Sequence, residues 1–328
     1  MSKKKASLSV SEDLSDVFTS VQRESFTAPE TKQNGITVNQ ALMIIVRQMK
    51  ASGKRPRTIS DYETYVNQLI NYTGIMYVAD VGVNTIYEWL SKMEVSNQTK
   101  LTRLKCIKAF LGKCFDNGWV EAPFWKQIKI KADIPVKEGA VDRDIELLLS
   151  LLDLGDFVQL RDATAVMVLY KTGIRISTLS ALEERHVDLE DQLLKLDGGV
   201  LKNHEQLFLP FNDTLKRLFT VLIKQNDLVR REYGVHNSLI FITSRGTQIS
   251  TSQSHNNIQK QLHKYSKKFG IKNLNPHALR RGYAKNLLKR GVDVATISRA
   301  LGHSGLDVTT RYLHLDKEEI VDKLRGYV

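Results

Sequence analysis

Helical periodicity dominates the first third of the chain, where apolar residues recur at spacings of three and four. The pattern predicts four helices. The first begins at a Thr37–Gln40 capping box, the second begins at about Thr58 after a basic loop at Lys54–Arg57, a short third follows, and the fourth ends at Gly118. The predicted inward positions of the fourth helix are Leu101, Leu104, Ile107, Leu111 and Phe115. We therefore expect residues 36–126 to form a small all-helical domain.

Breaks in this periodicity divide the rest of the chain. Residues 1–35 are polar and aperiodic, and we interpret them as a flexible arm. Residues 127–140 combine charges with Pro135 and Gly139 and have no helical rhythm, which predicts an interdomain linker. A second domain is then expected over residues 141–328.

The second domain mixes helical and strand patterns. The sequence predicts an amphipathic helix over Ile145–Leu154 and a more apolar helix over Ala163–Lys171. Three short β-type stretches follow, at Val187–Leu189, Leu193–Leu196 and Leu207–Pro210. The remainder reads as helices. The predicted fold class is therefore mainly α with a small β-sheet, in which an all-helical domain precedes a mixed α/β domain.

The composition excludes several classes of protein. With 42% apolar and 26% charged residues, the chain is neither disordered throughout nor fibrous. Its longest apolar runs, Leu42–Val46 and Ala165–Tyr170, fall far short of the roughly 20 residues of a membrane helix, so we expect a cytoplasmic protein without membrane contact. Cys106 and Cys114 are too few for a disulfide scaffold or a zinc site and are predicted to be buried thiols.

Positive charge is unevenly distributed along the chain, whose formal net charge is +12. Residues 201–300 hold eighteen basic and five acidic residues. Such a block favours a polyanionic partner, most commonly nucleic acid, although charge alone fits a solvated surface equally well. In the helical domain, we expect four polar or basic residues to contact such a partner: Arg57, Thr58, Lys100 and Arg103.

Candidate chemistry lies mainly in the C-terminal third. The chain has no Walker-type phosphate loop, no G-x-S-x-G elbow and no zinc-spaced Cys/His cluster, so we expect neither a metal nor a cofactor. The run Pro276-His277-Ala278-Leu279-Arg280 places His277 and Arg280 three residues apart, on one face of a helix that begins at a proline. A helix start favours phosphate binding.

Four further polar residues accompany this pair. Arg175 stands in Thr-Gly-Ile-Arg, just after a predicted helix stop, and Lys202 lies in the turn of the predicted hairpin. His303 follows Leu-Gly, and Tyr312 comes nine residues later. Taken singly, each residue fits an ordinary structural position better than a catalytic one. Their order and spacing together give the stronger signal.

This ordered set resembles the signature of the tyrosine recombinases, or phage integrase family, across roughly residues 36–325. The matching residues are Arg175, Lys202, His277, Arg280, His303 and Tyr312. Two features depart from the family pattern. Thr178 replaces the usual acidic residue three positions after the first arginine, and the glycines that usually flank the hairpin lysine are incomplete.

The chemistry of phosphodiester cleavage explains these residue types. Two arginines can clamp the phosphate oxygens with planar, permanently charged forks, and such stabilisation can replace a metal ion. The resemblance implies that Tyr312 is the nucleophile of a covalent 3′-phosphotyrosyl intermediate. It further implies that Lys202 protonates the leaving 5′ oxygen, His277 handles the proton of the tyrosine, and His303 binds the phosphate.

The resemblance implies a site-specific DNA recombinase that integrates, excises or resolves DNA elements. Its two domains would close on double-stranded core sites, with a dimer on each site, a tetramer at synapsis and strand exchange through a Holliday junction. The arm over residues 1–35 is shorter than an additional arm-binding domain, which favours a transposon, plasmid, phage or Xer-type enzyme of the nucleoid. The sequence specifies neither the DNA target nor any accessory DNA-bending protein.

Two alternatives stay open: a type IB topoisomerase, and a DNA-binding protein that has lost catalysis. The end of the chain adds an expectation about assembly. An apolar stripe consisting of Ile320, Val321, Leu324 and Tyr327 predicts a short tail helix. Because so short a helix is unstable alone, it must dock either on its own domain or, as the family favours, on a neighbouring protomer.

Overall fold

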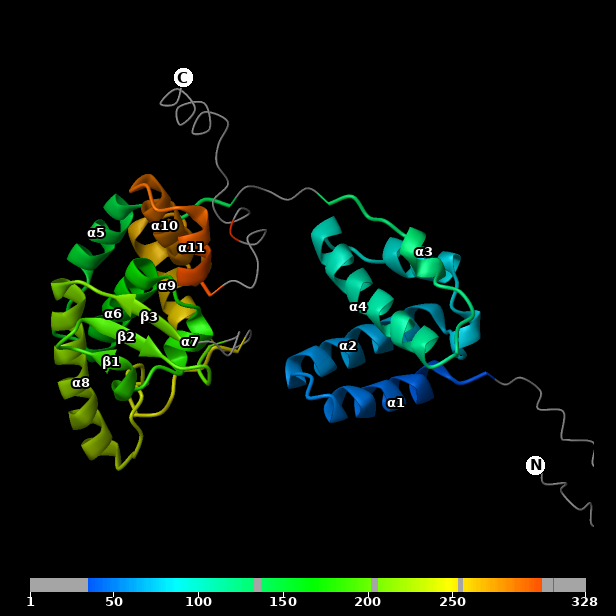
Figure 1. Cartoon of the computed structure of the whole chain (residues 1–328), viewed down its shortest axis with the longest axis horizontal. Coiled ribbons are helices and arrows are strands. Elements are labelled where there is room, and N and C mark those ends of the chain that lie inside the picture. The colour runs from blue at the N-terminus through cyan, green and yellow to red at the C-terminus, as the bar shows by residue number, and fades with distance from the viewer. Residues whose placement is uncertain (1–34, 133–136, 202–205, 253–255, 303–308, 310–328) are drawn as a thin grey trace, which may run out of the picture. The chain divides into compact units, whose positions relative to one another are not determined.

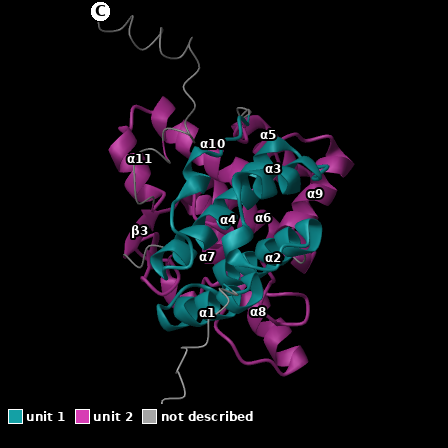
Figure 2. Ribbon diagram, turned by 90° about the vertical axis from the view of Figure 1, so that its right-hand side faces the viewer, with its two compact units in different colours: residues 1–134 teal, residues 135–328 magenta. Residues whose placement is uncertain are grey.

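The computed structural model describes residues 35–132, 137–201, 206–252, 256–302 and 309 (Figure 1). Contacts divide the chain into two compact units, residues 1–134 and 135–328, which are coloured separately in Figure 2. The predicted arm up to residue 34 and the tail helix lie outside the described residues. In the described part of the chain, no helix is both long and apolar enough to span a bilayer.

The first unit is built from helices, as the periodicity predicts. They are α1 (Val38–Ala51), α2 (Pro56–Thr73), α3 (Val83–Ser91) and α4 (Asn97–Asp116), with short 3₁₀ turns η1 (Val78–Asp80) and η2 (Phe124–Gln127). The capping box before α1 is confirmed: the Thr37 hydroxyl accepts from the Gln40 backbone N–H, and the Gln40 side chain accepts from the Thr37 N–H. Apolar residues from all four helices form one core that includes Ile45, Trp89 and Phe110.

Two details of the first unit differ from the sequence prediction. Helix α2 begins at Pro56 and not at Thr58, so Arg57 lies on the helix and not in a loop. Proline suits the first helical position because it lacks the N–H that would have no helical partner there. Phe115, which was predicted to face inward, is 42% exposed, because Phe110 and Cys114 occupy the core-facing positions of α4.

The predicted buried thiols are confirmed for one cysteine. Cys114 is fully buried, whereas Cys106 is only partly buried. Removal from water raises the pKa of each thiol to about 12, so neither carries a reactive thiolate at neutral pH.

The second unit packs helices around a small sheet. The helices are α5 (Asp142–Leu151), α6 (Phe157–Thr172), α7 (Ile176–Ser180), α8 (Asp213–Tyr233), α9 (Asn257–Phe269), α10 (Pro276–Lys289) and α11 (Val294–Ala300), with the 3₁₀ turn η3 (Glu184–His186). The strands β1 (Val187–Asp188), β2 (Leu193–Leu196) and β3 (Leu207–Pro210) form an antiparallel sheet in the order β1-β2-β3. Leu194 pairs with Leu209, so the predicted hairpin is confirmed with its strand limits.

Helix α6 is the central element of this unit. Every residue from Leu160 to Tyr170 is buried, and α8, α9 and α10 all contact the helix (Figure 1). The sequence placed the start of this helix at Ala163, but it begins at Phe157 after an Asp156 cap. A helix that is buried on all sides has no polar face, so periodicity could not mark its start. Helix α5 ends at Leu151, three residues before its predicted end.

Candidate active site

The joint between α6 and α7 positions Arg175. Gly173 ends α6 in the left-handed conformation, with φ of 66°, and a Cβ added there would lie 2.2 Å from the Tyr283 ring of α10. Only glycine therefore fits the turn. Arg175 is the N-cap residue of α7, and its Nη2 donates to the carbonyl oxygen of Gly302 at 3.1 Å.

Arg280 of α10 joins the same segments from the inside. Its side chain is 3% exposed, and its two terminal nitrogens donate to the carbonyl oxygens of Gly173 and of Leu301, the latter at 2.5 Å. A buried guanidinium is tolerated only when its donors are satisfied in this way. Arg280 thus fixes the end of α6, the start of α10 and the end of α11 relative to one another.

His277 lies one helical turn before Arg280. Asn275 caps α10, and its side chain accepts from the Ala278 N–H at 3.0 Å, so the histidine stands at the second helical position after Pro276. Partial removal from water lowers the pKa of His277. The charges of Arg281, Arg280, Lys137 and Arg175 lower it further. The imidazole is therefore neutral near pH 7 and able to accept a proton.

The structure thus brings together three of the six predicted catalytic residues, Arg175, His277 and Arg280, although about 100 residues separate the first from the other two. Their combined positive charge and the neutral imidazole suit a tetrahedral phosphate anion. Two further cations, Lys137 and Arg281, were missed in the sequence. Arg281 could have been noticed as the neighbour of Arg280, but only the tertiary fold brings Lys137 to the site.

The other three predicted catalytic residues, Lys202, His303 and Tyr312, lie outside the described residues. The backbone immediately before two of them is described. The Gly302 carbonyl accepts from Arg175, so the segment that leads to His303 is anchored to the arginine pair. Thr178, at the family's usual acidic position, donates to the Val200 carbonyl at 3.2 Å and so ties α7 to the backbone two residues before Lys202.

The predicted DNA-contacting residues of the first unit lie on α2 and α4. Arg57 forms an ion pair with Asp61 at 3.1 Å, and Thr58 is exposed on the same turn. Arg103 is partly buried, with its guanidinium 5.9 Å from the centre of the Tyr65 ring. Lys100 lies one turn before Arg103 on α4. The two arginines therefore already have protein contacts.

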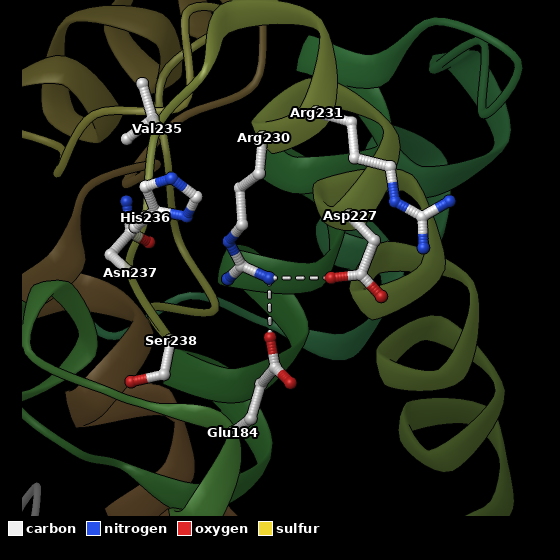
Figure 3. A pocket seen from close by; sticks show the side chains of 8 residues that line it. All are labelled: Glu184, Asp227, Arg230, Arg231, Val235, His236, Asn237 and Ser238. Carbon is white, nitrogen blue, oxygen red and sulfur yellow. Dashed lines mark hydrogen bonds and ion pairs between the residues drawn. The ribbon is translucent and has the colours of Figure 1, made fainter.

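A separate cavity of about 460 Å³ lies between α8 and the loop that follows it (Figure 3). Arg230 lines this cavity. Its Nη1 donates to the carboxylates of Glu184 at 2.7 Å and Asp227 at 3.0 Å, and its Nη2 donates to the Leu239 carbonyl at 2.6 Å. These contacts pair the guanidinium with two carboxylates and tie α8 to η3. Among the catalytic residues that the structure describes, Arg175, His277 and Arg280, none lines this cavity. In the described ranges, no three His, Cys, Asp or Glu side chains converge as a metal site would require.

The fold surrounds a neutral histidine with cations, an arrangement that suits a phosphate group. The sequence pattern of the phage integrase family matches residues 142–319, which is more than half of the chain. The chain therefore belongs to the phage integrase family and is a tyrosine site-specific recombinase.

Known proteins agree with this assignment. The tyrosine recombinase XerC of Roseiflexus castenholzii is 30% identical over 237 residues, which cover 70% of this chain and 72% of that protein. The Tn1549 transposon integrase in complex with a circular intermediate DNA has the same fold, with a TM-score of 0.71 and 18% identity over 89% of this chain and 99% of that chain. A lambda integrase dimer bound to a COC′ core site gives a TM-score of 0.66 at 13% identity, over 90% and 83% of the two chains.

Proposed function

We propose that this recombinase cleaves and rejoins duplex DNA at specific core sites through a covalent 3′-phosphotyrosyl intermediate. The observation that carries this proposal is the convergence of Arg175, Arg280 and a neutral His277 at the ends of α6, α10 and α11. The Tn1549 and lambda integrases were solved with DNA, which supports a DNA substrate here.

Each residue of the signature has a defined role in the proposed reaction. The phenolic oxygen of Tyr312 attacks the scissile phosphorus, and its proton passes to His277. The bond from phosphorus to the 5′ oxygen breaks, and Lys202 gives that oxygen a proton. Arg175 and Arg280 stabilise the charge on the non-bridging oxygens, together with a hydrogen bond from His303. The new bond conserves the energy of the old one, so attack by a 5′ hydroxyl reseals the strand without ATP.

The proposal includes assembly of several protomers on DNA. The lambda integrase structure is a dimer on a core site, which supports self-association of this chain. We extend this to a tetramer at synapsis that exchanges strands through a Holliday junction. Docking of the C-terminal stripe around Leu324 on a neighbouring protomer would couple the active sites. The proposed DNA substrate fits a location in the cytoplasm at the nucleoid.

Replacing the nucleophile tests the chemistry directly. The substrate is a core-site duplex with a nick beside the cleavage position, so that the cleaved fragment diffuses away and the covalent adduct accumulates. Tyr312→Phe removes one hydroxyl, so we expect no adduct on denaturing gels while binding to the site is retained. Tyr233→Phe, an exposed tyrosine of α8, is the matched control and should form adduct normally. A persistent adduct in the Tyr312→Phe protein would disprove the assignment.

The two alternative functions give different outcomes in the same system. A type IB topoisomerase would relax a supercoiled plasmid that carries no recombination site, whereas a site-specific recombinase would not. A DNA-binding protein without catalysis would form no adduct even as the wild type. Cleavage should also proceed in EDTA, because the arginines supply the positive charge that a metal would otherwise provide.

A further inference from the structure

The last residues before the second unit's first helix are attached to the helix that carries His277 and Arg280. We call residues 137–140 the linker exit. The Ala140 N–H donates to the Ala278 carbonyl at 2.9 Å, and Arg281 Nε donates to the Glu138 carbonyl at 2.9 Å. The Asn273 side chain donates to the Glu138 carboxylate at 3.0 Å. The linker exit is therefore bonded to α10, and to the loop before it, by backbone and side-chain contacts.

Two glycines bring these backbones into direct contact. A Cβ added to Gly139 would lie 2.7 Å from the Gly282 nitrogen, and one added to Gly282 would lie 2.5 Å from the Ala140 carbonyl oxygen. Gly282 also lies against the Tyr170 ring of α6. At both positions the nearest atoms are backbone, which cannot move aside as a flexible side chain can. The position of the linker exit on α10 is thus fixed by close packing and not by a mobile side chain.

This attachment determines where Lys137 lies. Lys137 directly precedes the bonded residues, its side chain is exposed, and it forms no ion pair with any residue that the structure describes. Besides burial, the positive charge of Lys137 lowers the pKa of His277. Arg281 and Arg280 on the same helix and Arg175 at the start of α7 do the same. A lysine on a flexible stem can place its ammonium against a phosphate oxygen as a point charge.

We propose that Lys137 is an additional phosphate-binding residue of the active site, and that the bonded linker exit holds it beside His277 and Arg280. The inference rests on the proposed function, because the phosphate is that of the DNA strand to be cleaved. Lys137 would contact this phosphate or its immediate neighbour. Lys137, which precedes the first helix of the second unit, would then complete the anion site.

The test measures the rate of covalent adduct formation on the nicked duplex, with enzyme in excess so that all DNA is bound. Lys137→Ala should slow adduct formation by about tenfold or more, since loss of one donor to a reacting phosphate commonly costs about 10²-fold or more and Lys137 is partly shielded by water. Lys137→Arg keeps the charge and should stay within about threefold of wild type. Lys289→Ala, an exposed lysine at the far end of α10, is the matched control and should leave the rate unchanged.

The pH profile separates this role from a purely structural one. Burial, together with the surrounding cations, lowers the pKa of His277, so the wild-type rate should fall on acidification only below the ordinary histidine range near pH 6.5. Removing the Lys137 charge raises the pKa of His277, and the acidic limb should move to higher pH in Lys137→Ala but not in Lys137→Arg. A change in packing alone would not shift the acidic limb in Lys137→Ala and leave it in place in Lys137→Arg.

The outcomes distinguish the inference from the proposed function. If Lys137→Ala forms adduct at the wild-type rate with an unshifted acidic limb, Lys137 does not bind the reacting phosphate, and the recombinase assignment stands. A slower rate that Lys137→Arg fails to restore would also overturn the inference. If the wild-type protein forms no adduct at all, the proposed function itself fails.

Discussion

The two units of this protein differ in what they bury. In the described part of the chain, every buried polar or charged side chain belongs to the second unit, for example Arg161, Asp162 and Arg280. The core of the first unit is apolar, and its charged residues lie at or near the surface. The first unit is therefore suited to bind the DNA backbone through its surface charge. The second unit uses buried polar contacts to hold its catalytic side chains in place.

The network around α6 illustrates this second strategy. Asp162 accepts from Arg161 at 2.7 Å and from the Tyr265 hydroxyl at 3.0 Å, and Arg161 also donates to the Ile242 carbonyl. Burial raises the pKa of Asp162, and the hydrogen bonds from Arg161 and Tyr265 oppose that rise. Buried polar contacts of this kind contribute more to a unique geometry than to net stability.

The largest expected effect comes from the buried guanidinium itself. Arg280→Lys keeps a positive charge but cannot bond Gly173 and Leu301 at once while facing a phosphate. We expect the cleavage rate of bound DNA to fall by about 10²–10³-fold. Lys100→Arg on α4, the reverse exchange in the first unit, should leave that rate unchanged. If both substitutions slowed cleavage equally in the same single-turnover assay, the division of catalysis and surface binding between the two units would be wrong.

A smaller effect is expected at the contact between α10 and the linker exit. Gly282→Ala would force the new methyl group against the Ala140 carbonyl and the Tyr170 ring, so we expect a loss of about 1–3 kcal/mol in the free energy of unfolding. Urea unfolding followed by circular dichroism measures this loss. An unchanged midpoint would show that α10 and the linker exit separate easily.

Surface charge in the first unit should affect binding and not chemistry. Lys100→Ala should lower the affinity for core-site DNA and reduce the slope of log Kd against log salt by about 0.9, the value for one phosphate contact. The rate of cleavage once the DNA is bound should not change. Binding titrations at several salt concentrations test this, and an unaltered salt slope would exclude Lys100 as a phosphate contact.

The smallest expected effect is a gain in stability. Gly112 lies within α4, and a Cβ added there would meet nothing within 4 Å. Gly112→Ala should therefore stabilise the protein by about 0.5–1 kcal/mol, because alanine loses less backbone entropy in a helix. Replacing a helical glycine with alanine is thus expected to lower the free energy of unfolding at Gly282 in the second unit and to raise it at Gly112 in the first. A destabilised Gly112→Ala protein in urea unfolding would contradict the open packing around α4.

Local signals in the sequence predicted much of this protein. Capping residues and apolar spacing located α1, and short β-type stretches located β2 and β3, because such signals act between residues close together in the chain. They failed where tertiary packing dominates. The start of α6 was missed because the helix has no polar face. The prediction for Phe115 was wrong because Cys114, one residue earlier on α4, faces the core instead.

The sequence by itself determined which residue types the site would use, since phosphate chemistry requires arginines and a histidine in a recognisable order. Only the tertiary structure decided how they meet. Arg280 reaches the Gly173 carbonyl across more than one hundred residues. The charge of Lys137 acts on His277 because Gly139 and Gly282 let the backbone of the linker exit lie against that of α10. Such contacts depend on the packing of whole helices, and no local pattern in the chain encodes a distance between segments so far apart.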